Sequence, residues 1–164
     1  MANKIAVMGG LLGFVLSFLA GIPVGIVFTG GITGLAGISV DLYHAGSNAA
    51  YIWGHTIGGI SESWFVIPTT GVFFGICMFC AAIIAATLAL CGAVKPEKRE
   101  ILLVAFCLEL VVFGVALLDQ FYFHVGVSGA DNTVWGGGMY LLFAAIAFLA
   151  IGWRFAPASK KESD

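Results

Sequence analysis

Charged residues are scarce in this chain: they make up 10% of its 164 residues, whereas 60% are hydrophobic. Soluble domains are about 25% charged and about 45–50% apolar. With a mean hydropathy of +1.05, the chain carries more apolar side chains than a soluble fold of this length can bury. The sequence therefore predicts an integral membrane protein. It has no basic face that would neutralise phosphates, which argues against a nucleic-acid partner.

Cysteine is missing from every polar segment. The four cysteines all lie within long apolar runs: Cys77, Cys80, Cys91 and Cys107. A disulfide framework needs cysteines that meet in an oxidising compartment, so we interpret these thiols as small packing residues. Cys77 and Cys80 have the CxxC spacing of a redox pair, but a thiolate is hard to stabilise in the middle of a bilayer, which favours packing.

Catalytic motifs are also absent, since the sequence has no Walker, Rossmann, Ser-His-Asp or zinc-protease pattern. The three histidines lie at the edges of the apolar runs, which argues against a haem held between helices. The sequence therefore favours a protein that is not an enzyme. It predicts no cofactor apart from the transition-metal site considered below.

Long apolar runs dominate what is present. A helix needs about 20 apolar residues to cross a bilayer. We place four spans at residues 5–30 with an extension to 40, 64–94, 101–123 and 134–155. The first run is too long for one straight crossing and contains Pro23, which removes a helix hydrogen bond. We therefore expect a long first helix that is kinked near Pro23.

The basic residues decide how many times the chain crosses. The seven are Lys4, Lys95, Lys98, Arg99, Arg154, Lys160 and Lys161. One crossing in the first run puts all of them on one side, as the positive-inside rule requires, whereas two crossings would place Lys4 opposite the 95–99 cluster. The sequence therefore predicts four crossings with both termini cytoplasmic, in a plasma or cytoplasmic membrane.

The predicted fold class is all-α: a four-helix (tetraspan) membrane bundle that forms a single transmembrane domain over residues 1–164. The outer loops are residues 41–63 and 124–133, the inner turn is 95–100 and the inner tail is 156–164. A larger first outer loop and a short inner turn are similar to the topology of claudin-like proteins. The tryptophan and cysteine motif of the claudin loop is absent, because the first loop contains Trp53 and no cysteine, and topology alone does not define a family.

Glycine pairs four residues apart recur along the first run. They are Gly9–Gly13, Gly21–Gly25 and Gly30–Gly34. Small residues at this spacing allow helices to approach closely in lipid. Three successive pairs predict a close helix contact along the first helix, either within the bundle or between copies of the chain. We interpret the run of three glycines at 136–138 as a flexible start of the fourth helix.

Histidine and carboxylate side chains gather on the predicted outer side, which has no Lys or Arg and should attract cations. The candidate metal ligands are Asp41, His44, His55, Asp119 and His124. Imidazole and carboxylate together suit copper, zinc or iron. The alternative is that these histidines lie at the membrane interface and bond to loop carbonyls, which their scattered spacing favours.

Glu109 is the carboxyl that the sequence places deepest in the membrane, eight residues or about 12 Å past the start of the third span. An unpaired, ionised carboxylate there costs several kcal/mol, so such a residue suggests a function. One interpretation is a protonated carboxyl hydrogen-bonded to Thr87. The other is an ion or proton pathway that includes Gln120, which lies eleven residues further on nearly the same helix face.

Three functional hypotheses follow. The first is a small non-catalytic membrane subunit or self-associating tetraspan scaffold, which packs through its glycine-rich first helix and presents its outer loops to partner proteins. The second is an oligomeric cation or proton pathway through Glu109 and Gln120. The third is an accessory subunit of a metal-dependent membrane enzyme that uses the outer histidines and aspartates. The expected partners are the lipid bilayer and other membrane subunits or copies of the chain.

Overall fold

The computed structural model describes residues 2–21, 40–46, 48–52, 54–57, 60–64, 71–126 and 133–157. This part of the chain is mostly helical. Its helices are α1 (Ala2–Gly21), α3 (Gly71–Val94), α4 (Arg99–Gly126) and α5 (Gly137–Phe155). Helices α3, α4 and α5 are each long and apolar enough to cross a membrane, as expected for a chain that is embedded in lipid. The apolar stretch of α1 is shorter and covers Lys4–Ala20.

Two helices begin later than the predicted spans. Trp64 ends a strand, and α3 begins at Gly71. Val134 and Trp135 form another strand, so α5 begins at Gly137. The predicted kink at Pro23 and the extension of the first helix to residue 40 lie outside the described residues.

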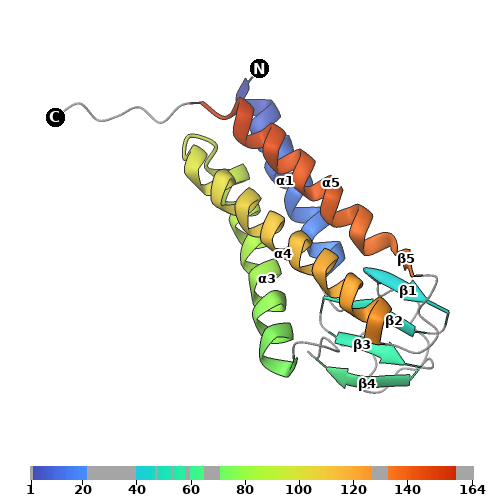
Figure 1. Ribbon diagram of the computed structural model, residues 1–164. Helices are drawn as coiled ribbons and strands as arrows, with labels where there is room; N and C mark the ends of the chain where they lie inside the picture. Colours follow the sequence, from blue (N-terminus) through green and yellow to red (C-terminus); the bar gives the residue numbers. More distant parts are fainter. Residues whose placement is uncertain are drawn as a thin grey trace, which may run out of the picture.

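An antiparallel sheet lies at one end of the bundle, so the prediction of an all-α chain is wrong in this respect (Figure 1). Its strands are β1 (Tyr43–Ala45), β2 (Asn48–Tyr51), β3 (Gly54–Ile57), β4 (Ile60–Trp64) and β5 (Val134–Trp135), in the order β4-β3-β2-β1-β5. Two residues separate each of the first three strands from the next, which is the length of a tight hairpin turn. Gly46 has a φ of 60°, the left-handed conformation that such turns require and that glycine adopts without strain.

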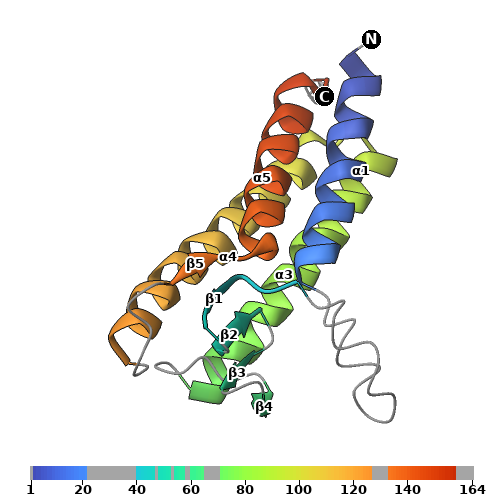
Figure 2. The same cartoon turned by 90° about the vertical axis from the view of Figure 1, so that its right-hand side faces the viewer.

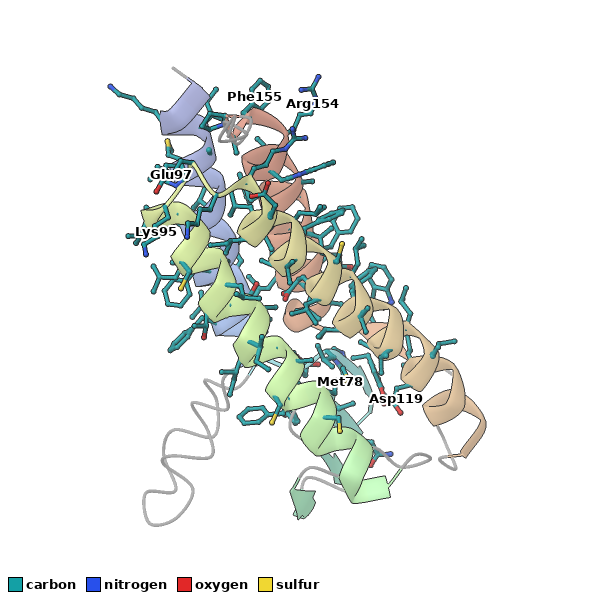
Figure 3. The ribbon with its side chains drawn as sticks, turned by 90° about the vertical axis from the view of Figure 1, so that its left-hand side faces the viewer. Met78, Lys95, Glu97, Asp119, Arg154 and Phe155 are labelled. Carbon is teal, nitrogen blue, oxygen red and sulfur yellow. The ribbon has the colours of Figure 1, made fainter. Side chains whose placement is uncertain are left out.

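The two ends of the bundle differ in charge. Figure 1 shows the start of α1, the turn between α3 and α4 and the end of α5 together at the end away from the sheet. The basic residues of the described chain are therefore at that end: Lys4, Lys95, Lys98, Arg99 and Arg154. Figure 3 shows Lys95 and Arg154 there, with Asp119 towards the sheet. The Arg99 guanidinium lies 4.8 Å from the centre of the Trp153 ring, which joins α4 to α5 at this end.

Each helix packs against two others, in the ring α1-α3-α4-α5, and Figure 2 shows α1 running alongside α5 and α3. Glycines bring α1 close to both neighbours. A Cβ atom built on Gly9 would lie 2.6 Å from the Cα of Gly152 on α5, and one on Gly13 would lie 2.6 Å from the side chain of Leu149. A Cβ on Gly10 would lie 2.9 Å from the Cβ of Ala93 on α3. These glycines are thus used in contacts within the chain.

The other glycines of the predicted pairs are not described in the same detail. Gly21 is the last residue of α1, and its surroundings are not described. Gly25, Gly30 and Gly34 lie outside the described residues. The predicted close contact along the rest of the first run therefore stays a prediction.

The interior of the bundle consists of two apolar clusters, one near the sheet and one near the basic end. The first includes Met78, Val112, Ala116 and Leu142, and the second includes Leu102, Ala105 and Leu149. The buried face of α4 runs through both clusters and consists of Leu102, Ala105, Glu109, Val112, Ala116 and Asp119. Their spacing of three and four residues is that of one helix face. Glu109 lies on this face between the two clusters.

Candidate functional site

Two groups of polar side chains are buried in the described part of the chain, one where the sheet meets the bundle and one at the centre of the bundle. The first contains Tyr43 of β1 and Asp119 of α4, both of which are buried. The Tyr43 hydroxyl donates a hydrogen bond to Oδ2 of Asp119. Burial and the neighbouring carboxylate raise the pKa of Tyr43 far above its ordinary value of 10.0, so its hydroxyl remains a donor.

A second hydrogen bond joins the sheet to the same helix. Nε1 of Trp135 on β5 donates to Oε1 of Gln120 at 2.8 Å. The Trp135 ring also packs edge-on against Phe113 of α4 and Tyr140 of α5. In the described part of the chain Gln120 therefore has a structural role, because its side chain holds β5 to the sheet end of α4.

Asp41 connects the start of the sheet to the start of α5. Its carbonyl oxygen accepts a hydrogen bond from the Gly138 amide at 2.7 Å, and its carboxylate lies 2.5 Å from Nδ1 of His44. A Cβ atom on Gly136 would lie 2.4 Å from the Asp41 carboxylate and carbonyl, and one on Gly138 would lie 2.8 Å from that carbonyl. The glycine run allows this close contact, so the interpretation of residues 136–138 as a flexible start is wrong.

The predicted metal ligands are distributed between these contacts. His44 pairs with Asp41, whereas Asp119 bonds to Tyr43. The strand register places His55 opposite Ala50, in the row of Tyr43, and His44 in the adjacent row. Adjacent rows of a sheet belong to opposite faces. The side chains of His55 and His124 are not described, and no group of three or more metal-ligating residues occurs among the residues described.

The rows of the sheet also separate a buried face from an open one. Tyr43 and Ala50 form a row that belongs to the apolar cluster near the sheet. The adjacent row consists of Val134, His44 and Ala49. In this row Val134 is 54% exposed. The sheet therefore covers the end of the bundle with one face and presents the other outward.

The second buried polar group is centred on Glu109. This side chain is fully buried, and neither of its carboxylate oxygens has a hydrogen-bond partner among the described residues. The Ser17 side chain of α1 faces it across the bundle and is 1% exposed; its hydroxyl is close enough to interact with the carboxyl, although no hydrogen bond of normal geometry joins the two. Thr87, the predicted partner, donates instead to the Ile83 carbonyl of its own helix at 2.8 Å, so that prediction is wrong.

Ser17 escaped the sequence analysis because a serine in an apolar run is an ordinary residue of membrane helices. The available signal was its spacing: Ser17 follows Gly9 and Gly13 at intervals of four residues, so the three share one face of α1. Since Gly9 and Gly13 were expected to face another helix, the same reasoning would have placed the Ser17 hydroxyl in the interior.

Together these features describe an apolar helical bundle with a sheet fixed to one end and an unsatisfied carboxyl at its centre. No protein-family model, curated protein or solved structure matches the chain.

Proposed function

We propose that this protein is a small, non-catalytic integral membrane subunit or scaffold, with four crossings and both termini cytoplasmic, whose outer sheet binds partner proteins. The observation that carries the proposal is the construction of the sheet. Segments on either side of α3 and α4 meet in it, since β1 pairs with both β2 and β5. A sheet assembled from two separate loops and fixed to the helices is a preorganised surface, which lowers the entropy lost on binding.

Three contacts support the rigidity of this surface. Tyr43 bonds to Asp119, Trp135 bonds to Gln120, and the Asp41 carbonyl bonds to the Gly138 amide. Each contact joins a strand or its flank to a different part of α4 or α5. Asp119, offered by the sequence as a metal ligand, and Gln120, offered as a pathway residue, thus support the sheet.

The outward row of the sheet is the part available to a partner. It includes Val134, His44 and Ala49, of which the first two combine an exposed apolar group and an imidazole. By contrast, Gly9 and Gly13 already contact α5. We therefore assign partner binding to the sheet rather than to the described glycines of α1.

Assembly in the native membrane tests this proposal. The protein is extracted in mild detergent and its complexes are sized by native gel and native mass spectrometry. We expect a defined assembly with other subunits or with further copies of the chain. Val134→Asp, which puts a charge in the outward row, should dissociate this assembly. The matched control Pro157→Asp places the same charge on an exposed residue at the other end and should leave it intact.

Two results would contradict the proposal. A wild-type chain that is monomeric at every extraction condition has no partner to bind. An assembly that dissociates equally in both variants, or only in Pro157→Asp, does not use the sheet.

The cation or proton pathway stays a prediction. On α4 the buried residues next to Glu109 are Ala105 on one side and Val112 on the other, both apolar. This face therefore supplies no continuous row of polar groups along the axis of the bundle, as a pathway through a single chain would need. Unchanged proton uptake by proteoliposomes carrying Glu109→Gln would remove this alternative.

A further inference from the structure

Glu109 and Ser17 leave three polar atoms at the centre of the bundle without a partner in the described chain: both carboxylate oxygens and the serine hydroxyl oxygen. The two residues come from α4 and α1, which are not neighbours in the ring, so the pair spans the axis of the bundle. Buried polar groups are nearly always hydrogen-bonded, because each unsatisfied one costs about 1–3 kcal/mol. A molecule that offers hydrogen bonds would satisfy the oxygens that the pair leaves unbonded.

A groove between α1 and α3 has Ser17 in its lining. It has a volume of about 140 Å³ and is lined by Phe14, Ser17, Phe18, Ala82, Ile83, Ala86 and Thr87. Phe18 and Ile83 are each 41% exposed, so the groove opens on the lipid-facing side of the bundle. An apolar cavity of about 150 Å³ is large enough to hold a benzene molecule. The groove is therefore wide enough for the head and first carbons of a lipid-soluble molecule.

The apolar lining of the groove suits the carbon chain of a ligand, and the Ser17–Glu109 pair suits a hydroxyl head. Apart from the hydroxyls of Ser17 and Thr87, the lining is apolar, and the Thr87 hydroxyl already donates to Ile83. Ser17 belongs both to the groove and to the pair with Glu109. The described spans contain no Lys or Arg at this depth. A neutral hydroxyl head costs less to bring here than an ammonium, which would have to be desolvated with the carboxylate.

We propose that Glu109 and Ser17 form a binding site for the hydroxyl head of a lipid-soluble alcohol, which enters from the bilayer through the groove between α1 and α3. The hydroxyl donates to one carboxyl oxygen and accepts from Ser17 or from the carboxyl proton. Its chain lies in the groove against Phe14 and Phe18. This site is separate from the outer sheet, and its existence does not depend on whether the sheet binds partners.

The structure offers a matched groove as a control. A second groove, of about 220 Å³, lies between α3 and α4 and is lined by Cys77, Met78, Ala81, Val111, Val112 and Val115. Ser17, which lines the first groove, does not line this one. Thr87 in the first groove and Val111 in the second are both exposed, so a phenylalanine at either position fills its groove without entering the core.

Dicyclohexylcarbodiimide is a suitable probe, because it is lipid-soluble and reacts with protonated carboxyls in apolar surroundings. The carboxyl O–H adds across one C=N bond, the proton goes to nitrogen, and the adduct rearranges to a stable N-acylurea with no atom lost. Peptide mass spectrometry of protein in bilayers should find this adduct on Glu109, and Glu109→Gln should lack it. Dodecan-1-ol should compete and slow the labelling.

The labelling rates of two variants then test whether the ligand enters through the groove between α1 and α3. We expect Thr87→Phe to slow the labelling of Glu109 about tenfold, which corresponds to 1.4 kcal/mol, and Val111→Phe to leave the rate unchanged. The helical circular dichroism spectrum of each variant confirms that it is folded. An unlabelled Glu109 in the wild type, a rate unaffected by dodecan-1-ol, or slowing by Val111→Phe instead of Thr87→Phe would each overturn the proposal.

Discussion

Tyr43 and Asp119 are 76 residues apart in the chain, yet they form the buried hydrogen bond that joins the sheet to α4. A buried carboxylate is costly unless a donor satisfies it. The Tyr43 hydroxyl supplies that donor from a ring that is itself fully buried. Removing only the Tyr43 hydroxyl would take this donor from the buried Asp119 carboxylate. The resulting loss of stability is therefore larger than the net contribution of the hydrogen bond.

Tyr43→Phe tests this bond. The variant keeps the ring but removes the donor, so it should lower the free energy of unfolding by about 1–3 kcal/mol at neutral pH. Because burial and Asp119 raise the pKa of Tyr43 in the folded state, its contribution is complete below the ordinary pKa of 10.0 and is lost as the pH rises above it. The difference between wild type and variant should therefore shrink above about pH 10.

Denaturant titrations in detergent micelles from pH 7 to 11 measure this difference. Tyr140→Phe is the control, since Tyr140 is 59% exposed and its hydroxyl should contribute little. A Tyr43→Phe variant as stable as the wild type at pH 7 would contradict the assigned role.

At the same scale, the sequence predicted the position of Glu109 but not its surroundings. Its depth follows from counting residues along one helix, and the structure places it fully buried at mid-span. Thr87 was a poor partner because a threonine hydroxyl inside a helix can bond to the carbonyl four residues earlier. Whether Ser17 faces the interior depends on how α1 is rotated about its axis. A helix that is apolar on every side gives little information about that rotation.

At the scale of elements, the contact between α1 and α5 depends on backbone approach. Gly9→Ala would place a methyl group 2.6 Å from the Gly152 backbone, so the helices must separate. We expect this variant to be destabilised by about 1–3 kcal/mol, the usual cost of overpacking. Gly114→Ala is the matched control, because a Cβ there meets nothing within 4 Å and alanine favours the helix by about 0.5–1 kcal/mol.

Unfolding of both variants in the same micelles gives the comparison. If Gly9→Ala is as stable as the wild type, the close approach of α1 to α5 does not limit the stability of the bundle. If Gly114→Ala loses as much stability as Gly9→Ala, the effect belongs to glycine in membrane helices generally and not to this crossing.

The helices were predictable as elements, whereas the sheet was not. Each helix has enough apolar residues to be recognised by length and composition. The strands are only two to five residues long, too short to establish an alternating pattern. The usable signals were the dipeptides Gly46-Ser47 and Gly58-Gly59, a type of sequence that is typical of hairpin turns. The strand β5 contains only two residues and is defined by its pairing with β1, which no local pattern reveals.

At the scale of the whole molecule, the distribution of charge and the architecture agree. The described basic residues share the end of the bundle formed by the start of α1, the turn between α3 and α4 and the end of α5. The sheet, with Asp41 and Asp119 beside it, forms the opposite end. For cations gathered at one end of the described bundle, the positive-inside rule predicts that this end is cytoplasmic.

Labelling of single introduced cysteines tests this orientation. Val134 in the outward row of the sheet and Lys98 in the turn before α4 are both exposed and lie on either side of α4. With a membrane-impermeant maleimide, Val134→Cys should react in intact cells, whereas Lys98→Cys should react only after permeabilisation. The native cysteines lie in the apolar helices α3 and α4, and the wild-type chain measures their background. Reversed accessibility would invert the orientation, and equal reaction in intact cells would mean that α4 does not cross. With the orientation inverted, the sheet would lose its place on the outer surface, and with it the proposed access to partners.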